Sequence, residues 1–139
     1  MVDRLSTKER SALMARIGSR DTGPELTVRR LLHSLGFRFR LQRADLPGRP
    51  DIVLSRSKKV IFVHGCFWHQ HAGCRKAALP KTREDFWRRK LEQNAARDRK
   101  AIEALLDLGW HSCIIWECQT KIPDVLKSRI TAFMTDQGS

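Results

Sequence analysis

VIFVHGCFWHQHAGC, residues 60–74, begins as an apolar run and ends as a loop rich in histidine and cysteine. An uninterrupted apolar run of this kind is typical of a buried strand. The segment DIVL, residues 51–54, precedes it across a short polar turn, and this arrangement predicts a β-hairpin. We therefore expect a sheet whose buried strand leads directly into the histidine- and cysteine-rich loop.

Helices and a further strand are predicted before this hairpin. Capping-box patterns predict two helices, one opened by Ser6 and Glu9 inside a basic helical arm of residues 1–19, the other opened by Thr22 and Glu25 and ended by Gly36. Residues 37–41 alternate apolar and basic side chains, as a half-solvated strand does.

The chain after the loop predicts another strand between two helices. Thr82 and Asp85 can cap a long helix that Gly109 ends, residues 110–116 form an apolar strand, and Pro123 starts a last helix. The long helix can serve as a right-handed crossover between two parallel strands. We therefore expect one α/β domain over residues 1–139, with a mixed β-sheet flanked by helices on both faces.

The charge of the chain favours a polyanionic partner. Its 139 residues carry a formal net charge of +12, an excess that favours phosphate contacts and counterion release. Residues 1–10 lack the apolar core of a signal peptide, and no run approaches membrane-spanning length. We therefore expect a cytoplasmic protein without a membrane segment, in which cysteines serve as thiols or metal ligands instead of forming disulfides.

The loop carries three soft metal ligands, Cys66, His71 and Cys74. Thiolates and imidazole suit zinc, and a closed structural site needs four such ligands. Cys118 follows the strand of residues 110–116 and can reach a neighbouring loop, whereas Cys113 lies inside that strand as a small core residue. We therefore expect zinc on Cys66, His71, Cys74 and Cys118, the alternative being ordinary buried thiols.

Acidic and histidine side chains are predicted to meet at one edge of the sheet. Asp51 begins one strand of the hairpin, His64 ends the other, and His69 lies just beyond. A carboxylate there can hold Mg²⁺, and histidines can act as acid, base or water-orienting groups on a phosphodiester. Glu25 can join them. Spacing alone also allows a turn residue at Asp51, a capping partner at Glu25 and a core histidine at His64.

Two Phe-Trp pairs lie close to these ligands in the sequence. Phe67 and Trp68 lie on the loop, and Phe86 and Trp87 begin the long helix. Aromatic wedges can enter a base step, but the same rings can cover the zinc loop. We expect Phe86 to face inward, together with a core position for Trp110 and Trp116. Basic residues that can hold phosphates surround the pairs: Arg75, Lys76, Lys81, Arg83 and Arg88.

The combination of these motifs resembles the very short patch repair (Vsr) endonuclease family. The resemblance rests on LPGRPD, FVHGCFWHQHAGC, the FW that heads a basic helix containing NAARDRK, and LGW with IIWEC downstream. It implies a type II restriction-endonuclease-like core with a structural zinc. It also implies a Mg²⁺-dependent enzyme that nicks double-stranded DNA 5′ of the thymine in T:G mismatches left by deamination of 5-methylcytosine.

The resemblance also implies a role for each matching position. Asp51 and the backbone carbonyl of Val63 would hold Mg²⁺, His69 would act as acid and base, and His64 and Glu25 would assist through water. Phe67, Trp68 and Trp87 would form the wedge, and zinc would lie on Cys66, His71, Cys74 and Cys118. The implied partners are a cytosine-5 methyltransferase system and mismatch-repair proteins such as MutL, with the enzyme acting as a monomer.

This chain departs from the family pattern at three places. Val63 stands where some relatives carry threonine, Gln70 replaces a histidine, and the spacing from His71 to Cys74 is one residue longer. A restriction-type nuclease acting on matched duplex is the alternative within the same chemistry. A zinc-stabilised DNA-binding module without catalysis is the alternative outside it.

Overall fold

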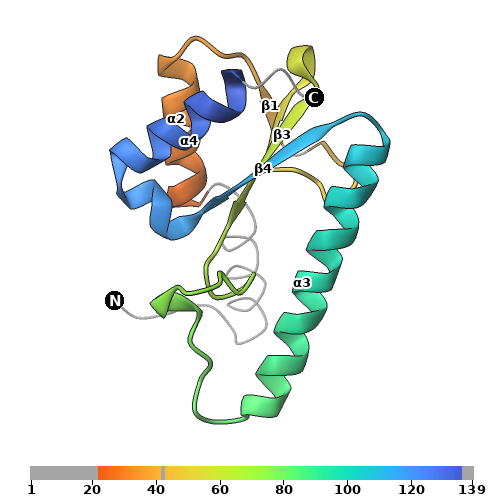
Figure 1. Cartoon of the computed structure of the whole chain (residues 1–139), viewed down its shortest axis with the longest axis vertical. Helices are drawn as coiled ribbons and strands as arrows, with labels where there is room; N and C mark the ends of the chain where they lie inside the picture. Colours follow the sequence, from red (N-terminus) through yellow and green to blue (C-terminus); the bar gives the residue numbers. More distant parts are fainter. Residues whose placement is uncertain (1–21, 42, 136–139) are drawn as a thin grey trace, which may run out of the picture.

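A four-stranded mixed sheet forms the centre of the protein (Figure 1). The computed structural model describes residues 22–41 and 43–135, so the arm expected within residues 1–19 lies outside the described residues. The strands are β1 (Arg40–Leu41), β2 (Ile52–Leu54), β3 (Lys59–His64) and β4 (His111–Trp116), in the order β1-β2-β3-β4. The predicted hairpin is confirmed, because β2 and β3 pair antiparallel with Ile52 opposite Ile61.

Strands β3 and β4 pair in parallel, with His64 opposite Trp116 at their ends. A parallel pair needs a long connection, and helix α3 (Glu84–Asp107) is part of it. Both strands therefore end at the same edge of the sheet, and the loop of residues 65–83 leaves from that edge.

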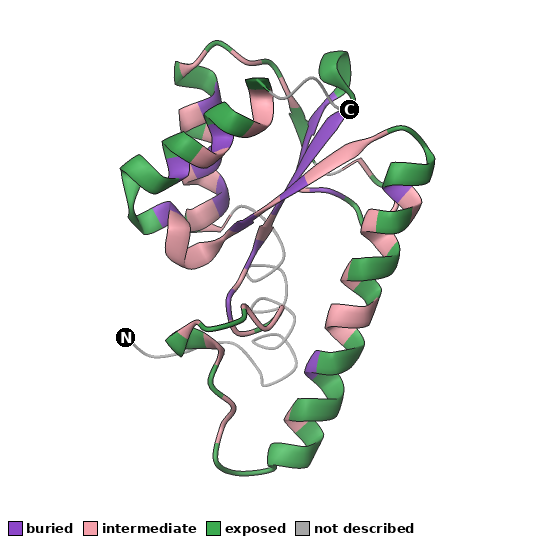
Figure 2. Cartoon of the chain, in the orientation of Figure 1, coloured by how far each residue is buried: buried purple, intermediate pink, exposed green. Residues whose placement is uncertain are grey.

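Helices cover both faces of the sheet, as the sequence predicts. Helices α2 (Gly23–Ser34) and α4 (Pro123–Thr135) lie side by side on one face, and α3 lies on the other (Figure 1). Buried side chains alternate along the strands between two clusters, and Figure 2 shows most of the sheet as buried. The cluster under α2 and α4 includes Ile61 and Ile115, and the cluster under α3 includes Val60 and Phe62.

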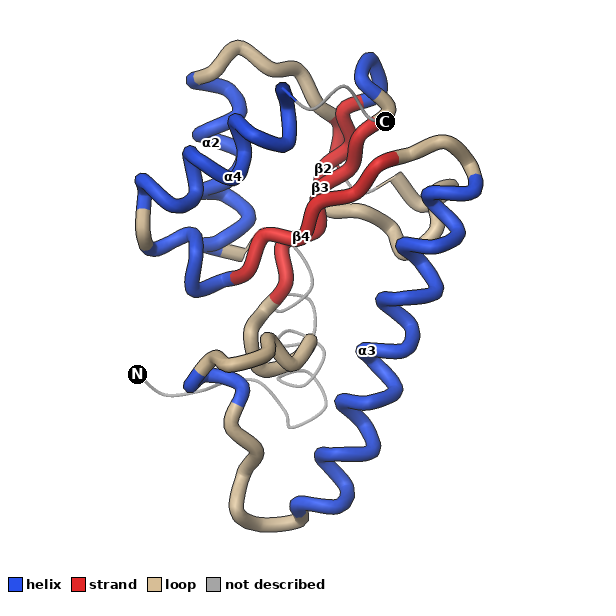
Figure 3. The backbone as a smooth tube through the Cα atoms, viewed as in Figure 1, coloured by secondary structure: helices blue, strands red, loops and turns tan. Residues whose placement is uncertain are grey.

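Helix α3 extends well past the sheet (Figure 3). Its last turns pack on the sheet through Leu105, whereas its first half lies beside the loop that follows β3. Short 3₁₀ turns complete the described chain: η1 (Ser55–Ser57), η2 (Arg75–Ala77) and η3 (Glu117–Lys121). None of the helices in the described part combines the length and the apolarity that crossing a membrane requires.

The helix ends agree with the sequence at α2 and differ at α3. The side-chain oxygen of Thr22 accepts the backbone N–H of Glu25, and Gly36 after the helix has a φ of +86°, as a C-terminal glycine does. The expected cap of α3 by Thr82 and Asp85 is wrong. Arg83 occupies that position with a left-handed backbone and makes no side-chain cap, so α3 begins at Glu84.

Other expectations about strands and aromatic residues are also corrected. Only residues 40 and 41 of the strand expected over residues 37–41 pair, with Val53 and Ile52 of β2. Phe86 faces outward with 45% of its surface exposed, since α3 has no sheet beneath it there. Trp110 and Trp116 are half-buried: Trp110 packs against the cluster under α3, as expected, whereas the ring of Trp116 stacks on that of His71. Cys113 is buried as expected.

Candidate functional site

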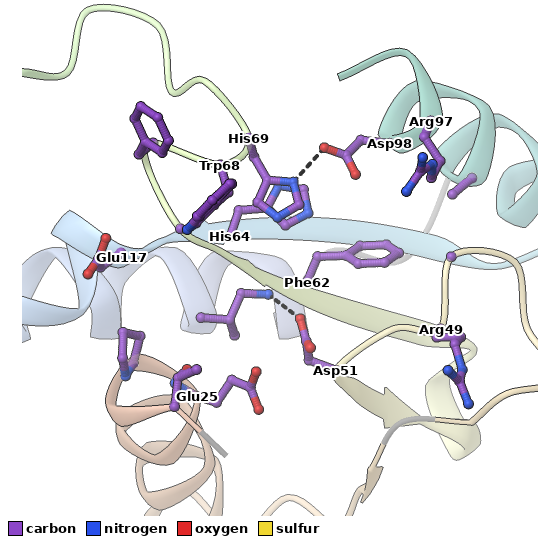
Figure 4. A pocket seen from close by; sticks show the side chains of 17 residues that line it. Glu25, Arg49, Asp51, Phe62, His64, Trp68, His69, Arg97, Asp98 and Glu117 are labelled. Atoms are coloured by element: carbon purple, nitrogen blue, oxygen red, sulfur yellow. Dashed lines mark hydrogen bonds and ion pairs between the residues drawn. The ribbon is translucent and has the colours of Figure 1, made fainter. Parts of the chain in front are cut away.

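A pocket of about 610 Å³ opens where β3 ends, between the start of α2 and the middle of α3 (Figure 4). Its lining includes all four residues expected to take part in catalysis, Glu25, Asp51, His64 and His69. The structure therefore brings together side chains that come from α2, from the residue preceding β2, from the end of β3 and from the following loop.

The turn of residues 46–50 packs closely against α3 at Gly48, which lines this pocket. A Cβ atom at Gly48 would lie 2.6 Å from the Cβ of Ala101 on α3 and 3.3 Å from the ring of Phe62. The φ of +75° at Gly48 is also one that favours glycine. This contact between the turn and α3 delivers Asp51 to the pocket.

The carboxylate of Asp51 is fixed against the backbone of β3. Its Oδ2 atom accepts the backbone N–H of Val63 at 2.7 Å. Burial raises the pKa of Asp51 to about 6, although the hydrogen bond from Val63 and the nearby His69 and Arg29 oppose that rise. Burying a carboxylate is costly unless a cation or hydrogen-bond donors compensate it. A bound cation would therefore stabilise the charged form of Asp51.

The buried Glu25 lies beside Asp51 at the start of α2 (Figure 4). Arg29, one helical turn later, donates to its carboxylate at 3.1 Å. Two carboxylates thus line the same pocket, and such hard oxygen donors fit Mg²⁺. Glu25 and Asp51 can also hold the waters that this ion usually keeps.

The two histidines of the pocket lie against each other. The rings of His64 and His69 stack with centroids 3.7 Å apart, and Trp116 meets His64 edge-on. Burial, reinforced by the neighbouring His69, lowers the pKa of His64 to about 4, so its ring is neutral near pH 7. Within the described part of the chain its Nδ1 atom is buried and makes no hydrogen bond. His64 can therefore orient a water or a substrate oxygen without carrying charge.

Asp98 on α3 is the residue of this site that the sequence interpretation missed. Its Oδ2 atom lies 2.6 Å from Nδ1 of His69. Such a partner holds the imidazole with a proton on Nδ1 and leaves Nε2 to exchange protons with a substrate. A signal was present in the sequence: Asp98 lies seven residues from both Leu91 and Leu105, which are buried on the inner face of α3.

A second cluster lies on the loop beyond the pocket. The ligand atoms of Cys66, His71, Cys74 and Cys118 all lie within 4.8 Å of one another, so this group could hold a metal ion. The Sγ atom of Cys118 is 3.5 Å from Nδ1 of His71, whereas Cys113 is buried in β4 beside Arg129. Two soft donor types in a group of four fit a closed zinc site.

Local geometry prepares this cluster for a metal. The backbone N–H of His71 donates to the carbonyl of Cys66, and a glycine with a φ of +74°, Gly73, turns the chain before Cys74. Burial raises the pKa of Cys66 to about 11, and the backbone N–H of Lys76 lowers the pKa of Cys74. A metal ion would convert the buried thiol of Cys66 to the thiolate that it does not favour alone.

Three rings form an aromatic cluster, defined here as Phe67, Trp68 and Trp87. Their ring centroids lie 5.2 to 6.0 Å apart, so α3 and the loop meet through these rings. Trp68 keeps 49% of its surface exposed and also lines the pocket. An exposed aromatic face thus lies next to the acid and histidine groups.

The basic residues around the aromatic cluster are exposed. This holds for Arg75, Lys76, Lys81, Arg83 and Arg88. Arg88 pairs with Glu84 at 2.7 Å, and the guanidinium of Arg83 lies over the ring of Phe86. Glu117, the first residue of η3, also lines the pocket.

Comparison with known proteins identifies the family. The model of the DNA mismatch endonuclease Vsr family matches residues 2–76. The chain is 41% identical to the DNA mismatch endonuclease Vsr of Escherichia coli, over 100% of this chain and 92% of that protein. It is 50% identical to the type II nicking enzyme V.XorIIP of Xanthomonas oryzae pv. oryzae, over 94% of this chain and 95% of that protein.

The chain belongs to the Vsr family of DNA mismatch endonucleases. A further relative, the type II nicking enzyme V.NmeAIP of Neisseria meningitidis, is 39% identical over 98% of this chain and 96% of its own length. The family resemblance read from the motifs is thereby confirmed. The expected class of enzyme, a strand-nicking endonuclease, is confirmed as well.

Proposed function

We propose that this enzyme hydrolyses one phosphodiester of double-stranded DNA, 5′ of the thymine in a T:G mismatch that arises from deamination of 5-methylcytosine. The observation that carries the proposal is a pocket in which Asp51, His64 and the His69–Asp98 pair adjoin the half-exposed Trp68. This shared lining supports the proposal, because the groups proposed for hydrolysis and the ring proposed to stack on a base border the same pocket.

Asp51 and the backbone carbonyl of Val63 would hold Mg²⁺, with Glu25 binding waters around it. A magnesium ion held there would supply charge neutralisation at the phosphate and activation of a water. His69, oriented by Asp98, transfers protons to and from the reacting oxygens at Nε2. The neutral ring of His64 orients the water, in keeping with its burial.

The remaining groups bind and distort the duplex. The aromatic cluster would enter the base stack beside the mismatch, because T:G pairs are easier to unstack than matched pairs. Arg75, Lys76, Lys81, Arg83 and Arg88 would contact phosphates. Zinc on Cys66, His71, Cys74 and Cys118 would tie the loop that carries Phe67 and Trp68, acting as a structural ion.

The proposal extends to the fold and the setting of the enzyme. The mixed sheet flanked by helices, with its acid at a strand edge, supports a type II restriction-endonuclease-like core within a single domain of residues 1–139. Deaminated 5-methylcytosine arises where a cytosine-5 methyltransferase acts, so the enzyme would work beside such a system in the cytoplasm. It would act as a monomer and cooperate with mismatch-repair proteins such as MutL.

One assay tests the proposal. The protein is incubated with matched and T:G duplexes plus Mg²⁺, alongside the variants Asp51→Ala and His69→Ala. We expect nicking of the thymine strand of the mismatched duplex alone, and its loss in Asp51→Ala. Cleavage of both strands of matched DNA would support a restriction-type nuclease, and binding without cleavage would support a non-catalytic module; either result overturns the proposal.

A further inference from the structure

Two side-chain amides donate hydrogen bonds to the backbone of the aromatic pair on the loop, Phe67 and Trp68. The Nε2 atom of Gln70 donates to the carbonyl of Phe67 at 2.7 Å and to the carbonyl of Ala77 at 3.2 Å. The Nδ2 atom of Asn94 on α3 donates to the carbonyl of Trp68 at 3.2 Å. Consecutive carbonyls of the loop are therefore held from two different segments of the chain.

Gln70 holds its carbonyls from a constrained backbone position. Its φ is +52°, a region that few residues other than glycine adopt, and its own N–H also donates to the carbonyl of Phe67. Its hydrogen bond to the carbonyl of Ala77 reaches a residue that follows the Cys66–Cys74 segment. The amide of Gln70 thus ties the aromatic pair to the chain that leaves the metal cluster.

Asn94 holds the loop from the opposite side. It lies one helical turn before Asp98, so adjacent turns of α3 bind the adjacent residues Trp68 and His69. The hydrogen bond from Asn94 reaches only the backbone of Trp68, and the indole keeps 49% of its surface exposed. The aromatic face therefore stays available while its position is fixed.

We propose that Gln70 and Asn94 are positioning residues that hold Phe67 and Trp68 ready to enter a base step and thereby set the preference for mismatched over matched DNA. This inference rests on the proposed function. A wedge that is ordered before binding loses little conformational entropy on insertion, whereas a loose one must be ordered against the resistance of the stack. The preference then depends on amides that need not contact the reacting phosphate.

The test compares Gln70→Ala and Asn94→Ala with Gln93→Ala, a neighbour of Asn94 that is exposed and makes no side-chain hydrogen bond within the described residues. Single-turnover nicking of T:G and matched duplexes is measured, together with zinc content and melting temperature. We expect the ratio of the two rates to fall at least about threefold in each amide variant, since Asn94→Ala removes one hydrogen bond and Gln70→Ala removes two, and to stay unchanged in Gln93→Ala.

A double-mutant cycle shows whether the amides act through the wedge. In a Trp68→Ala background, Asn94→Ala should lower the T:G preference by less than about twofold, because the group it positions is gone. An equal loss in both backgrounds overturns the inference, since Asn94 would then act on DNA directly. The pH dependence of nicking should match that of the wild type, because the His69–Asp98 pair is untouched.

The two ideas fail in different ways. A wild-type enzyme that nicks T:G and matched DNA equally overturns the proposed function. A wild-type enzyme that prefers T:G, with Gln70→Ala and Asn94→Ala variants that are folded, contain zinc and keep the full preference, overturns this inference alone.

Discussion

The carboxylate of Asp98 lies 2.6 Å from Nδ1 of His69, and the two residues stand 29 positions apart in the chain. This contact joins the middle of α3 to the loop that leaves β3. It fixes one nitrogen of an imidazole that lines the pocket, and an oriented imidazole is what a general acid or base needs.

We expect Asp98→Asn to lower the rate of nicking about a hundredfold or more, because an amide cannot stabilise the charged imidazolium and can hold the wrong tautomer. The measurement is single-turnover nicking of a T:G duplex at saturating protein. Glu103→Gln, on an exposed face of the same helix, is the control and should nick as the wild type does. Full activity in Asp98→Asn would mean that His69 needs no carboxylate.

Asp51→Asn should abolish nicking and stabilise the metal-free fold above pH 6. Burial raises the pKa of Asp51 to about 6, above the value of about 3.9 for an unfolded chain. The folded state therefore binds more protons between these two values, and the free energy of unfolding falls as the pH rises through that window. The amide carries no charge and escapes this loss.

We expect Asp51→Asn to gain about 1 to 2 kcal/mol in the free energy of unfolding at neutral pH, measured by denaturant titration in chelator. Asp45→Asn is the control, because Asp45 is exposed and its pKa is lowered by the hydrogen bond from Arg43. It should show no gain. Identical pH profiles of stability in Asp51→Asn and the wild type would contradict the burial argument.

Zinc should be lost from Cys118→Ala and retained by Cys113→Ala. Cys118 belongs to the four-ligand cluster, whereas Cys113 is a buried residue of β4. Removing one of four ligands usually destroys a structural site, and the fold loses the stabilisation that the metal gives. Metal analysis and melting temperature measure both effects; full zinc content in Cys118→Ala would place the fourth ligand elsewhere.

Trp68→Ala should weaken the preference for T:G DNA more than it weakens binding to duplex in general. Base stacking on an aromatic ring contributes about 1 to 3 kcal/mol, so the preference should fall at least about fivefold. Phe86→Ala is a matched control, because Phe86 is 45% exposed but does not line the pocket. Equal losses of preference and general affinity in Trp68→Ala would make the ring merely structural.

Gly48→Ala should lower the free energy of unfolding by about 1 to 3 kcal/mol and also reduce nicking. A Cβ there would overlap the Cβ of Ala101, and the φ of +75° adds backbone strain. Gly109→Ala measures the backbone strain without the overlap, since the φ of Gly109 is +86° and no atom lies within 4 Å of the added Cβ. Gly48→Ala should cost less in an Ala101→Gly background than in the wild type; an equal cost in both backgrounds would refute the packing argument.

Local patterns were sufficient for much of the fold. The apolar runs of residues 51–54, 60–64 and 110–116 predicted β2, β3 and β4, because buried strands must be apolar whatever packs on them. Thr22 and Gly36 marked the ends of α2 through bonds made within a few residues. The choice of Cys118 over Cys113 also followed from position relative to one strand.

Errors arose where an element depended on a distant partner. The strand expected over residues 37–41 pairs at only two residues, since pairing depends on the path of β2, which comes later in the chain. Phe86 was expected to face inward, but the first turns of α3 lie beyond the sheet and offer no core to enter. Neither fact can be read from the segment itself.

The side chains available for chemistry can be read from the sequence: soft ligands and aromatic rings on one loop, and an acid and a histidine at the ends of neighbouring strands. The contacts of Asp98 with His69, and of Gln70 and Asn94 with the aromatic pair, cannot be read from it. The reason is physical. Strands and caps form through nearby residues, whereas these hydrogen bonds depend on how α3, far along the chain, packs beside the loop.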